Sequence, residues 1–348
     1  MSRAPRVAAF DHGHVAFARG AGGVRLGLRA LGDADWLECA CGDAVGTGGA
    51  ADTPDTPVES GVAVKRELLR EQRADVFREL DGSEAAQLEL EQEVTELCAA
   101  ASLPSPAARP ATPPDDPSPI VRAGLRVRDD LCILQPRDGR HVLTAAFVCA
   151  PSYWRLADKI GRPLAAIHAP VPELEAKIGK AVERTIASLA AGRPLVRLGW
   201  GIGASPVLFR PGRDDDETAA VAGIEREWAG AADDARRVET LARVGRTLHV
   251  RTERQSLRRL ERSGAVVFSI RVYADRLDAV AADASRAAEL HGALAGLTAA
   301  ETDYKGLTRL RAPLLAYLAA AAAEALPRST ASPSRSSPPA DTNPGPDA

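Results

Sequence analysis

The sequence predicts an α+β protein, with an antiparallel sheet, a helical insertion within it, and N-terminal and C-terminal helices. Three observations support this. Residues 64–98 have helical spacing and are rich in Glu, Leu and Arg. Residues 124–150, 194–202 and 264–274 carry the short apolar runs and alternation typical of strands. Glycine and proline separate the two kinds of segment, which indicates that helices and strands follow one another within one chain.

Segments rich in proline and small residues divide the 348-residue chain. Proline fixes φ and removes a donor, and small polar side chains bury little surface. We therefore expect loops or linkers at 46–58 and 102–119 and a disordered tail at 327–348. The predicted organisation is an N-terminal segment over 1–101 that packs on the core, the linker, a core over 120–326, and the tail.

The elements can be assigned in order along the chain. Residues 64–98 predict a helical hairpin with its break at Asp81-Gly82. In the core, Asp138-Gly139 indicates a β-hairpin, and Ser152 fits the N-cap of a helix over 153–160. The remaining expectations are a helix from Pro172 to Gly192, strands at 194–202, 246–252 and 264–274, and helices from 286 to 326. Two strands, a helical insertion and three strands make the element order of a PAS domain.

Composition excludes several classes of function. Acidic and basic residues nearly balance, at a formal net charge of −3, whereas nucleic-acid binding usually needs a basic excess. No stretch has the apolar length of a membrane span, and the N-terminus lacks the apolar centre of a signal peptide. Five cysteines make no disulfide framework, and the glycine clusters lack dinucleotide-binding spacing. We expect a cytoplasmic protein that contacts neither nucleic acid nor membrane.

Four longer runs of sequence carry a family resemblance. They are "GLRALGDADWLE" (27–38), "VCAPSYWRLADKIGRPLAAIHAPVP" (148–172), "LHVRTERQSLRRLERSGAVVFSIRVYA" (248–274) and "YKGL" (304–307). With them the chain resembles the haem-dependent oxidative N-demethylase family, roughly from Leu26 to Leu318, whose catalytic alpha-type subunit is a PAS-derived haem protein. One departure is Gly199-Trp200, where the family commonly has Asn-Trp.

The resemblance implies a monooxygenase. Haem b would activate oxygen to remove a methyl group from a small secondary amine, giving formaldehyde. Partner reductase subunits carrying FMN and an iron–sulfur centre would pass on electrons from NADPH, since this chain shows no cofactor fingerprint of its own. The alternative reading is a non-catalytic haem-binding PAS sensor module on the same fold.

The candidate iron ligand is His168, in "GRPLAAIHAPVP". The resemblance and its position in the helical insertion favour it as the axial ligand, and a neutral imidazole in an apolar setting suits iron. A core histidine satisfied by a backbone carbonyl is the alternative. Cys149 is the rival ligand, because thiolate ligation also suits oxygen activation.

Haem propionates and a cationic amine need partners of opposite charge. Lys159 and Arg162 precede His168, and Arg254 and Arg258 share one face if their segment is helical. These four are the predicted propionate-binding residues. Tyr304 is the candidate donor to bound oxygen. For the amine the candidate neighbours are Trp154, which we place with Tyr304 as catalytic, together with Trp200, Asp158 and Glu253.

Overall fold

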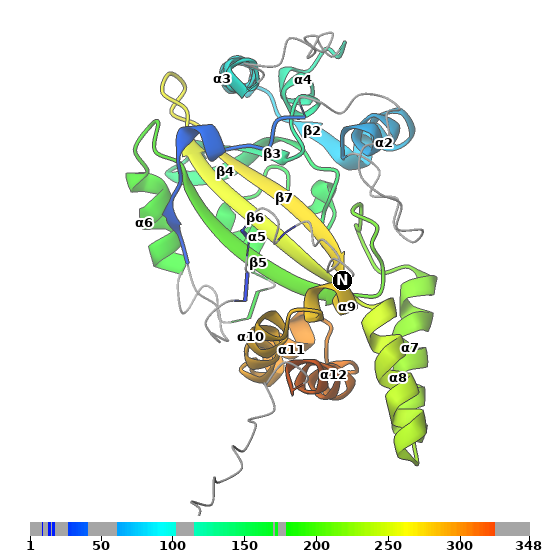
Figure 1. The fold of residues 1–348 in the computed structure, drawn as a ribbon. Coiled ribbons are helices and arrows are strands. Elements are labelled where there is room, and N and C mark those ends of the chain that lie inside the picture. Colours follow the sequence, from blue (N-terminus) through cyan, green and yellow to red (C-terminus); the bar gives the residue numbers. More distant parts are fainter. Residues whose placement is uncertain are drawn as a thin grey trace, which may run out of the picture.

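The computed structural model describes residues 27–40, 61–101, 115–169, 171–172 and 179–323, with 9, 13, 14, 16 and 17. Its described part contains a seven-stranded sheet in the order β1-β5-β6-β7-β3-β4-β2, with every pair antiparallel (Figure 1). The strands are β1 Arg29–Ala30, β2 Phe77–Glu79, β3 Asp130–Arg137, β4 Arg140–Phe147, β5 Leu195–Gly203, β6 His249–Arg259 and β7 Val266–Arg276. The predicted α+β class with an antiparallel sheet is confirmed.

The predicted β-hairpin joins β3 to β4. Asp138 and Gly139 both have positive φ, 49° and 74°, as a two-residue type I′ turn requires, and Arg137 pairs with Arg140 across the turn. The register shifts between Ile133 and Leu134, whose partners are Ala145 and Leu143, so Thr144 is the extra residue of a bulge in β4. The predicted strands that became β5 and β7 lie where the sequence placed them, and β6 extends beyond its predicted end through Arg259.

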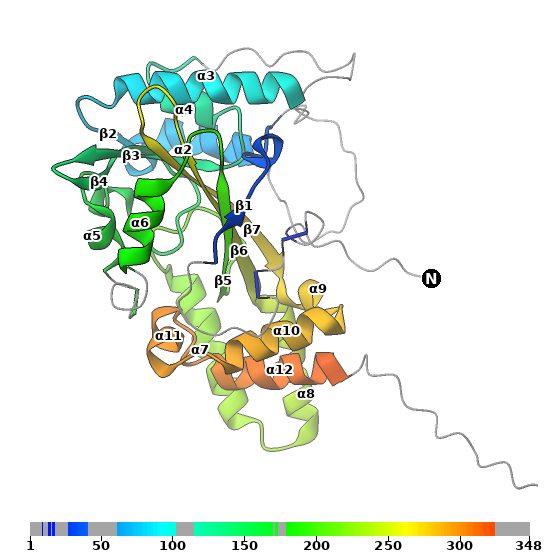
Figure 2. The same cartoon turned by 90° about the vertical axis from the view of Figure 1, so that its left-hand side faces the viewer.

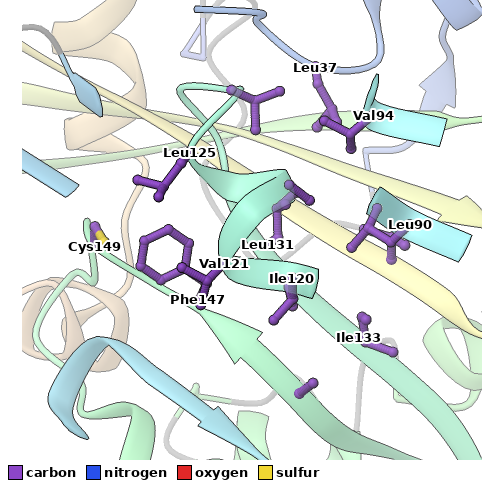
Figure 3. Close-up of a cluster of buried hydrophobic side chains, with 14 of the residues drawn as sticks. Leu37, Leu90, Val94, Ile120, Val121, Leu125, Leu131, Ile133, Phe147 and Cys149 are labelled. Atoms are coloured by element: carbon purple, nitrogen blue, oxygen red, sulfur yellow. The ribbon is translucent and has the colours of Figure 1, made fainter. Parts of the chain in front are cut away.

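Helices α2 (Gly61–Val76), α3 (Glu84–Ala101) and α4 (Pro119–Gly124) cover one side of β3 and β4 (Figures 1 and 2). Leu90 and Val94 of α3 meet Leu131, Ile133 and Phe147 of the sheet in a buried cluster (Figure 3). The two helices predicted within 64–98 are present as α2 and α3, with the turn at 81–82 between them, but they do not form a hairpin. The chain leaves α2 as strand β2, which pairs with β4, and α3 packs on α4. Edge pairing at β4 therefore overrides the helix propensity of this stretch.

The opposite side of β3 and β4 carries the helical insertion. It consists of the 3-10 turn η2 (Leu156–Asp158), α5 (Leu164–His168) and α6 (Lys180–Ser188). The predicted helix over 153–160 is wrong, because only η2 forms and Ser152 does not cap it. The Tyr153 N–H donates instead to the carbonyl of Arg210, which holds this segment extended beside another loop. Gly161 and Gly192 have positive φ at the predicted helix ends.

A third group of helices covers the far end of β5, β6 and β7 (Figure 2). It comprises α7 Asp215–Gly230, α8 Asp234–Thr247, α9 Leu277–Ala281, α10 Ala284–Ala295, α11 Ala299–Tyr304 and α12 Arg311–Ala323. The acid-rich segment 212–237 contains α7 and the start of α8. Asp214 and Asp233 cap the two helices with their side chains, so the start signals were present in the acidic run.

Some expectations fall outside the described residues. These are the segment 46–58, most of the linker 102–119, the tail 327–348 and the start of the helix predicted from Pro172. The domain boundaries stay predictions. Among the described helices, none is both long enough and apolar enough to cross a membrane.

Candidate functional site

His168 is the last residue of α5, a five-residue helix between Pro163 and Pro170. Its Nδ1 lies 3.0 Å from the carbonyl oxygen of Leu164, which can only accept, so Nδ1 carries the proton. Burial lowers the pKa of the imidazole, and the positive charges of Arg197 and Lys159 lower it further, against the bond to Leu164. The ring is therefore neutral at pH 7. Nε2 has a free lone pair and no bond to a described residue, as a metal-ligating imidazole requires.

Lys159 and Arg162 flank α5 as the sequence predicted. The Lys159 Nζ donates to the carbonyl of Ile167, 2.7 Å away, so it ties η2 to α5. Burial and the neighbouring Arg162 lower the pKa of Lys159. Arg162 is exposed. Both cations lie on the segment that leads into His168, and the structure thus brings them to the same side of the sheet as the imidazole.

Arg197 is a site residue that the sequence analysis missed. It lies on β5, and its charge acts on His168, Tyr304 and Glu253. Burial lowers its own pKa, offset by Glu253. The guanidinium makes no hydrogen bond or ion pair with any residue that the structure describes. The available signal was an arginine inside the apolar strand "PLVRLGWGI", because a charged side chain among buried residues usually has a partner of opposite charge.

Two glycines follow Arg197 on the same face of β5, because side chains alternate along a strand. A Cβ placed on Gly201 would meet no described atom within 4 Å. A Cβ on Gly199 would meet only Gln255 and Glu253, each at 3.9 Å. Glycine inside a strand often marks a place where a ligand approaches the backbone closely. We call this face of β5 the glycine floor, defined by Gly199 and Gly201.

Glu253 of β6 lies opposite Gly199 in the strand pairing and so projects beside the glycine floor. Its Oε1 accepts a 2.5 Å hydrogen bond from Ser152 Oγ, and its Oε2 accepts one of 2.7 Å from Gln255 Nε2. Among the described residues no Lys, Arg or His nitrogen lies within 4.0 Å of it. The carboxylate is therefore oriented by two neutral donors.

A buried network supports Ser152 from behind. Arg251 donates to Ser152 Oγ at 3.4 Å and to the carbonyls of Val207 and Leu208. The Tyr153 hydroxyl donates to Glu217 Oε1 at 2.7 Å, and burial together with this bond raises the pKa of Tyr153 to about 12. Tyr153 has φ of +63°, a strained value for a residue with a side chain. Strain of this kind persists where the surroundings over-determine the backbone.

The other predicted substrate-side residues have different environments. Tyr304, at the end of α11, is 51% exposed. Burial of part of the ring and the charge of Glu253 raise the pKa of its hydroxyl. Trp154 packs on the apolar cluster beneath the insertion, beside Ile160 and Ile167. The Trp200 ring lies under Lys305 Nζ at 4.6 Å. The hydroxyl of Tyr304 is thus within reach of the charges of Glu253 and Arg197, whereas Trp154 packs in an apolar cluster.

The structure does not bring Arg254 and Arg258 to His168. Their segment is strand β6, in which the four-residue spacing again places both on one face, but on the face opposite Glu253. Arg254 donates to the carbonyls of Asp35 and Trp36 and lies 3.6 Å from Asp129 Oδ1. Arg258 bonds Asp33 and Glu93, at 2.6 and 2.8 Å. Both guanidinium groups are already engaged.

Cys149 also lies apart from His168. It is buried in the cluster under α2, α3 and α4 (Figure 3). Burial and the neighbouring Asp130 raise the pKa of its thiol well above the ordinary value, so it stays protonated at pH 7. A metal ligand must be a thiolate. The geometry therefore favours His168 over Cys149.

The chain has a match among known protein families. A family model described as "haem-dependent oxidative N-demethylase, alpha subunit-like" matches residues 102–315, which is more than half of the chain. The matched range contains His168, Arg197, the glycine floor and Glu253.

Proposed function

Because the chain belongs to the haem-dependent oxidative N-demethylase alpha-subunit-like family, we propose that it is the haem-binding catalytic subunit of an N-demethylase. In this proposal it removes a methyl group from a small secondary amine and releases formaldehyde. Electrons come from NADPH through partner reductase subunits carrying FMN and an iron–sulfur centre. The observation that supports it best is the neutral His168, whose Nε2 is free beside the uncommitted Arg197.

The donor set fits haem b. A single imidazole is the protein ligand that haem iron commonly takes, and its second nitrogen usually donates to a carbonyl or carboxylate. Arg197 and Lys159 would hold the propionates. Strands β3 to β7 with the insertion after β4 follow the PAS-like order, and this supports a group held between sheet and insertion.

Haem supplies oxygen activation when bound. Converting an N-methyl C–H bond to C–OH consumes one O2, two electrons and two protons, and releases one water. The C–N bond of the carbinolamine then breaks, nitrogen keeps the electron pair and formaldehyde leaves. The chain holds the amine, excludes water and places a donor, for which Tyr304 is the proposed residue and Trp154 a proposed wall.

Replacing His168 with alanine tests the ligand. The variant should lose the Soret band or show it shifted, and added imidazole should restore it by filling the space of the lost ring. His291→Ala, on α10, is the matched control and should leave the spectrum unchanged. A wild-type spectrum in His168→Ala would remove His168 from the site.

Turnover tests the reaction. The protein with a surrogate reductase, oxygen and a panel of N-methyl amines should release formaldehyde above the uncoupled background. If haem binds and is reduced but no formaldehyde is released, the demethylase proposal is rejected in favour of the non-catalytic haem sensor.

A further inference from the structure

We propose that Glu253 is the subsite for the ammonium group of the substrate, with Ser152 as its positioning residue. The inference rests on the proposed function for its substrate class, an alkylammonium. It concerns a carboxylate next to the glycine floor, on the same face of the sheet as Arg197.

The first argument is orientation. The two hydrogen bonds, from Ser152 Oγ and from Gln255 Nε2, fix one oxygen each. A carboxylate offers about four lone-pair positions, so roughly two remain for a ligand. Ser152 is itself held, because it accepts from Arg251, whose other donors bind the carbonyls of Val207 and Leu208.

The second argument is charge. Glu253 is half-buried, and taking a carboxylate out of water costs free energy that neutral donors recover only in part. The nearby cations are directed elsewhere. Arg251 donates to the carbonyl of Val207, and Lys305 Nζ donates to the carbonyl of Trp200 at 2.7 Å. Arg197 is not within ion-pair distance of the carboxylate. A bound ammonium would supply the contact charge that the described residues do not.

The third argument is space. The pairing of Gly199 with Glu253 puts the glycine floor directly beside the carboxylate. An ammonium on Glu253 would extend its alkyl groups over Gly199 and Gly201, where a Cβ meets little or nothing. The size of the amine that fits would then depend on these two glycines.

The direct test is Glu253→Gln, which keeps the shape and removes the charge. Binding of dimethylammonium and of N-methylpropylammonium to the haem-loaded protein is measured by calorimetry and by the change in the Soret band. We expect Kd for both to rise about 10- to 100-fold, the effect of losing a charge-assisted hydrogen bond. Haem content should be unchanged, and so should binding of the neutral N-methylacetamide. Glu261→Gln, an exposed carboxylate on the β6–β7 turn, is the matched control.

Two further variants keep the test decisive if Glu253→Gln fails to fold. Ser152→Ala should raise KM for the amines several-fold with the haem spectrum unaltered. Gly199→Val should weaken the binding of N-methylpropylammonium more than the binding of dimethylammonium. Unchanged amine binding in Glu253→Gln, or no binding of either amine by the wild type, overturns the subsite. Amine binding that depends on Glu253 without formaldehyde release would keep the subsite and reject the demethylase.

Discussion

Strand β6 presents charged side chains to both faces of the sheet, and the two faces use them differently. On the α2–α4 side, Arg254 and Arg258 are bound to carboxylates and carbonyls. On the insertion side Arg251 and Arg259 also bind carbonyls, but Glu253 meets no cation within 4.0 Å, and Arg197 of the neighbouring β5 makes no hydrogen bond or ion pair with a described residue. The first arrangement stabilises the fold. On the insertion side, Glu253 and Arg197 keep charges available to a ligand, which is how a binding face differs from a structural one.

The α2–α4 side of the sheet, which we call the engaged face, also holds the segment 27–40 against the strands. Asp129 accepts from the Glu38 N–H, and Arg271 bonds the Glu38 carboxylate at 2.7 Å. The Tyr273 hydroxyl donates to the same carboxylate, and Ser256 and Ser269 share a 2.6 Å hydrogen bond below it. Buried polar groups in such a network depend on one another, so removing one exposes several unsatisfied partners.

Arg254→Ala should have the largest effect on stability. It leaves Asp129 buried without its cation and frees the carbonyls of Asp35 and Trp36. Removing one partner of a buried ion pair costs about 3–5 kcal/mol, and we expect that loss in urea unfolding. Haem bound per folded molecule should not change. A selective loss of haem with full stability would show that Arg254 serves the cofactor after all.

Asp129 should give the engaged face a pH dependence. Burial raises its pKa to about 6, from an ordinary value of 3.8, against the hydrogen bond from the Glu38 N–H and the charge of Arg254. Between these values the folded state holds the proton more tightly than the unfolded state. The contribution of Asp129 to the free energy of unfolding therefore falls as pH rises from about 4 to about 6. Two pKa units correspond to about 3 kcal/mol. The difference in unfolding free energy between wild type and Asp129→Asn should therefore fall with pH over this range, and a constant difference would contradict it.

Arg197→Ala tests the insertion side of the sheet, where we expect an effect on haem and little effect on stability. Because the guanidinium has no partner among the described residues, the unfolding free energy should change by no more than about 1 kcal/mol. Haem affinity should fall about 10-fold, the effect of losing a charge-assisted contact to a propionate. Competition for haem by apomyoglobin measures this. Arg193→Ala, an exposed arginine just before β5, shows whether the effect is specific to Arg197.

Tyr304→Phe should have the smallest effect. Half of the side chain is exposed, so stability should stay within about 0.5 kcal/mol. If the hydroxyl donates to bound oxygen, the oxygen affinity of the reduced protein should fall about 2- to 10-fold. An unchanged affinity would leave Tyr304 without this role. Carbon monoxide, a weak acceptor, serves as the control ligand.

The sequence was sufficient for features set by neighbouring residues. Asp138-Gly139 predicted the turn because few residue pairs tolerate two positive φ values. The prolines around 164–168 limited α5 to one short helix, and the family motifs pointed to His168. Ser152 shows the limit of local patterns. It fits a helix cap, yet in the fold its hydroxyl serves a carboxylate 101 residues away.

By itself, then, the sequence determined the class of fold, most of strands β3 to β7 and the family, and it proposed the candidate ligand, since each depends on short-range conformational preference or on ordered motifs. Only the tertiary structure decided which charges are free. The four-residue spacing of Arg254 and Arg258 predicted one shared face in a helix or a strand, but not which face. The choice depended on Asp129, Asp33 and Glu93, which reach β6 from distant parts of the chain. In the described structure no residue of opposite charge comes within ion-pair distance of Arg197 or Glu253, although Ser152 and Gln255 donate hydrogen bonds to Glu253.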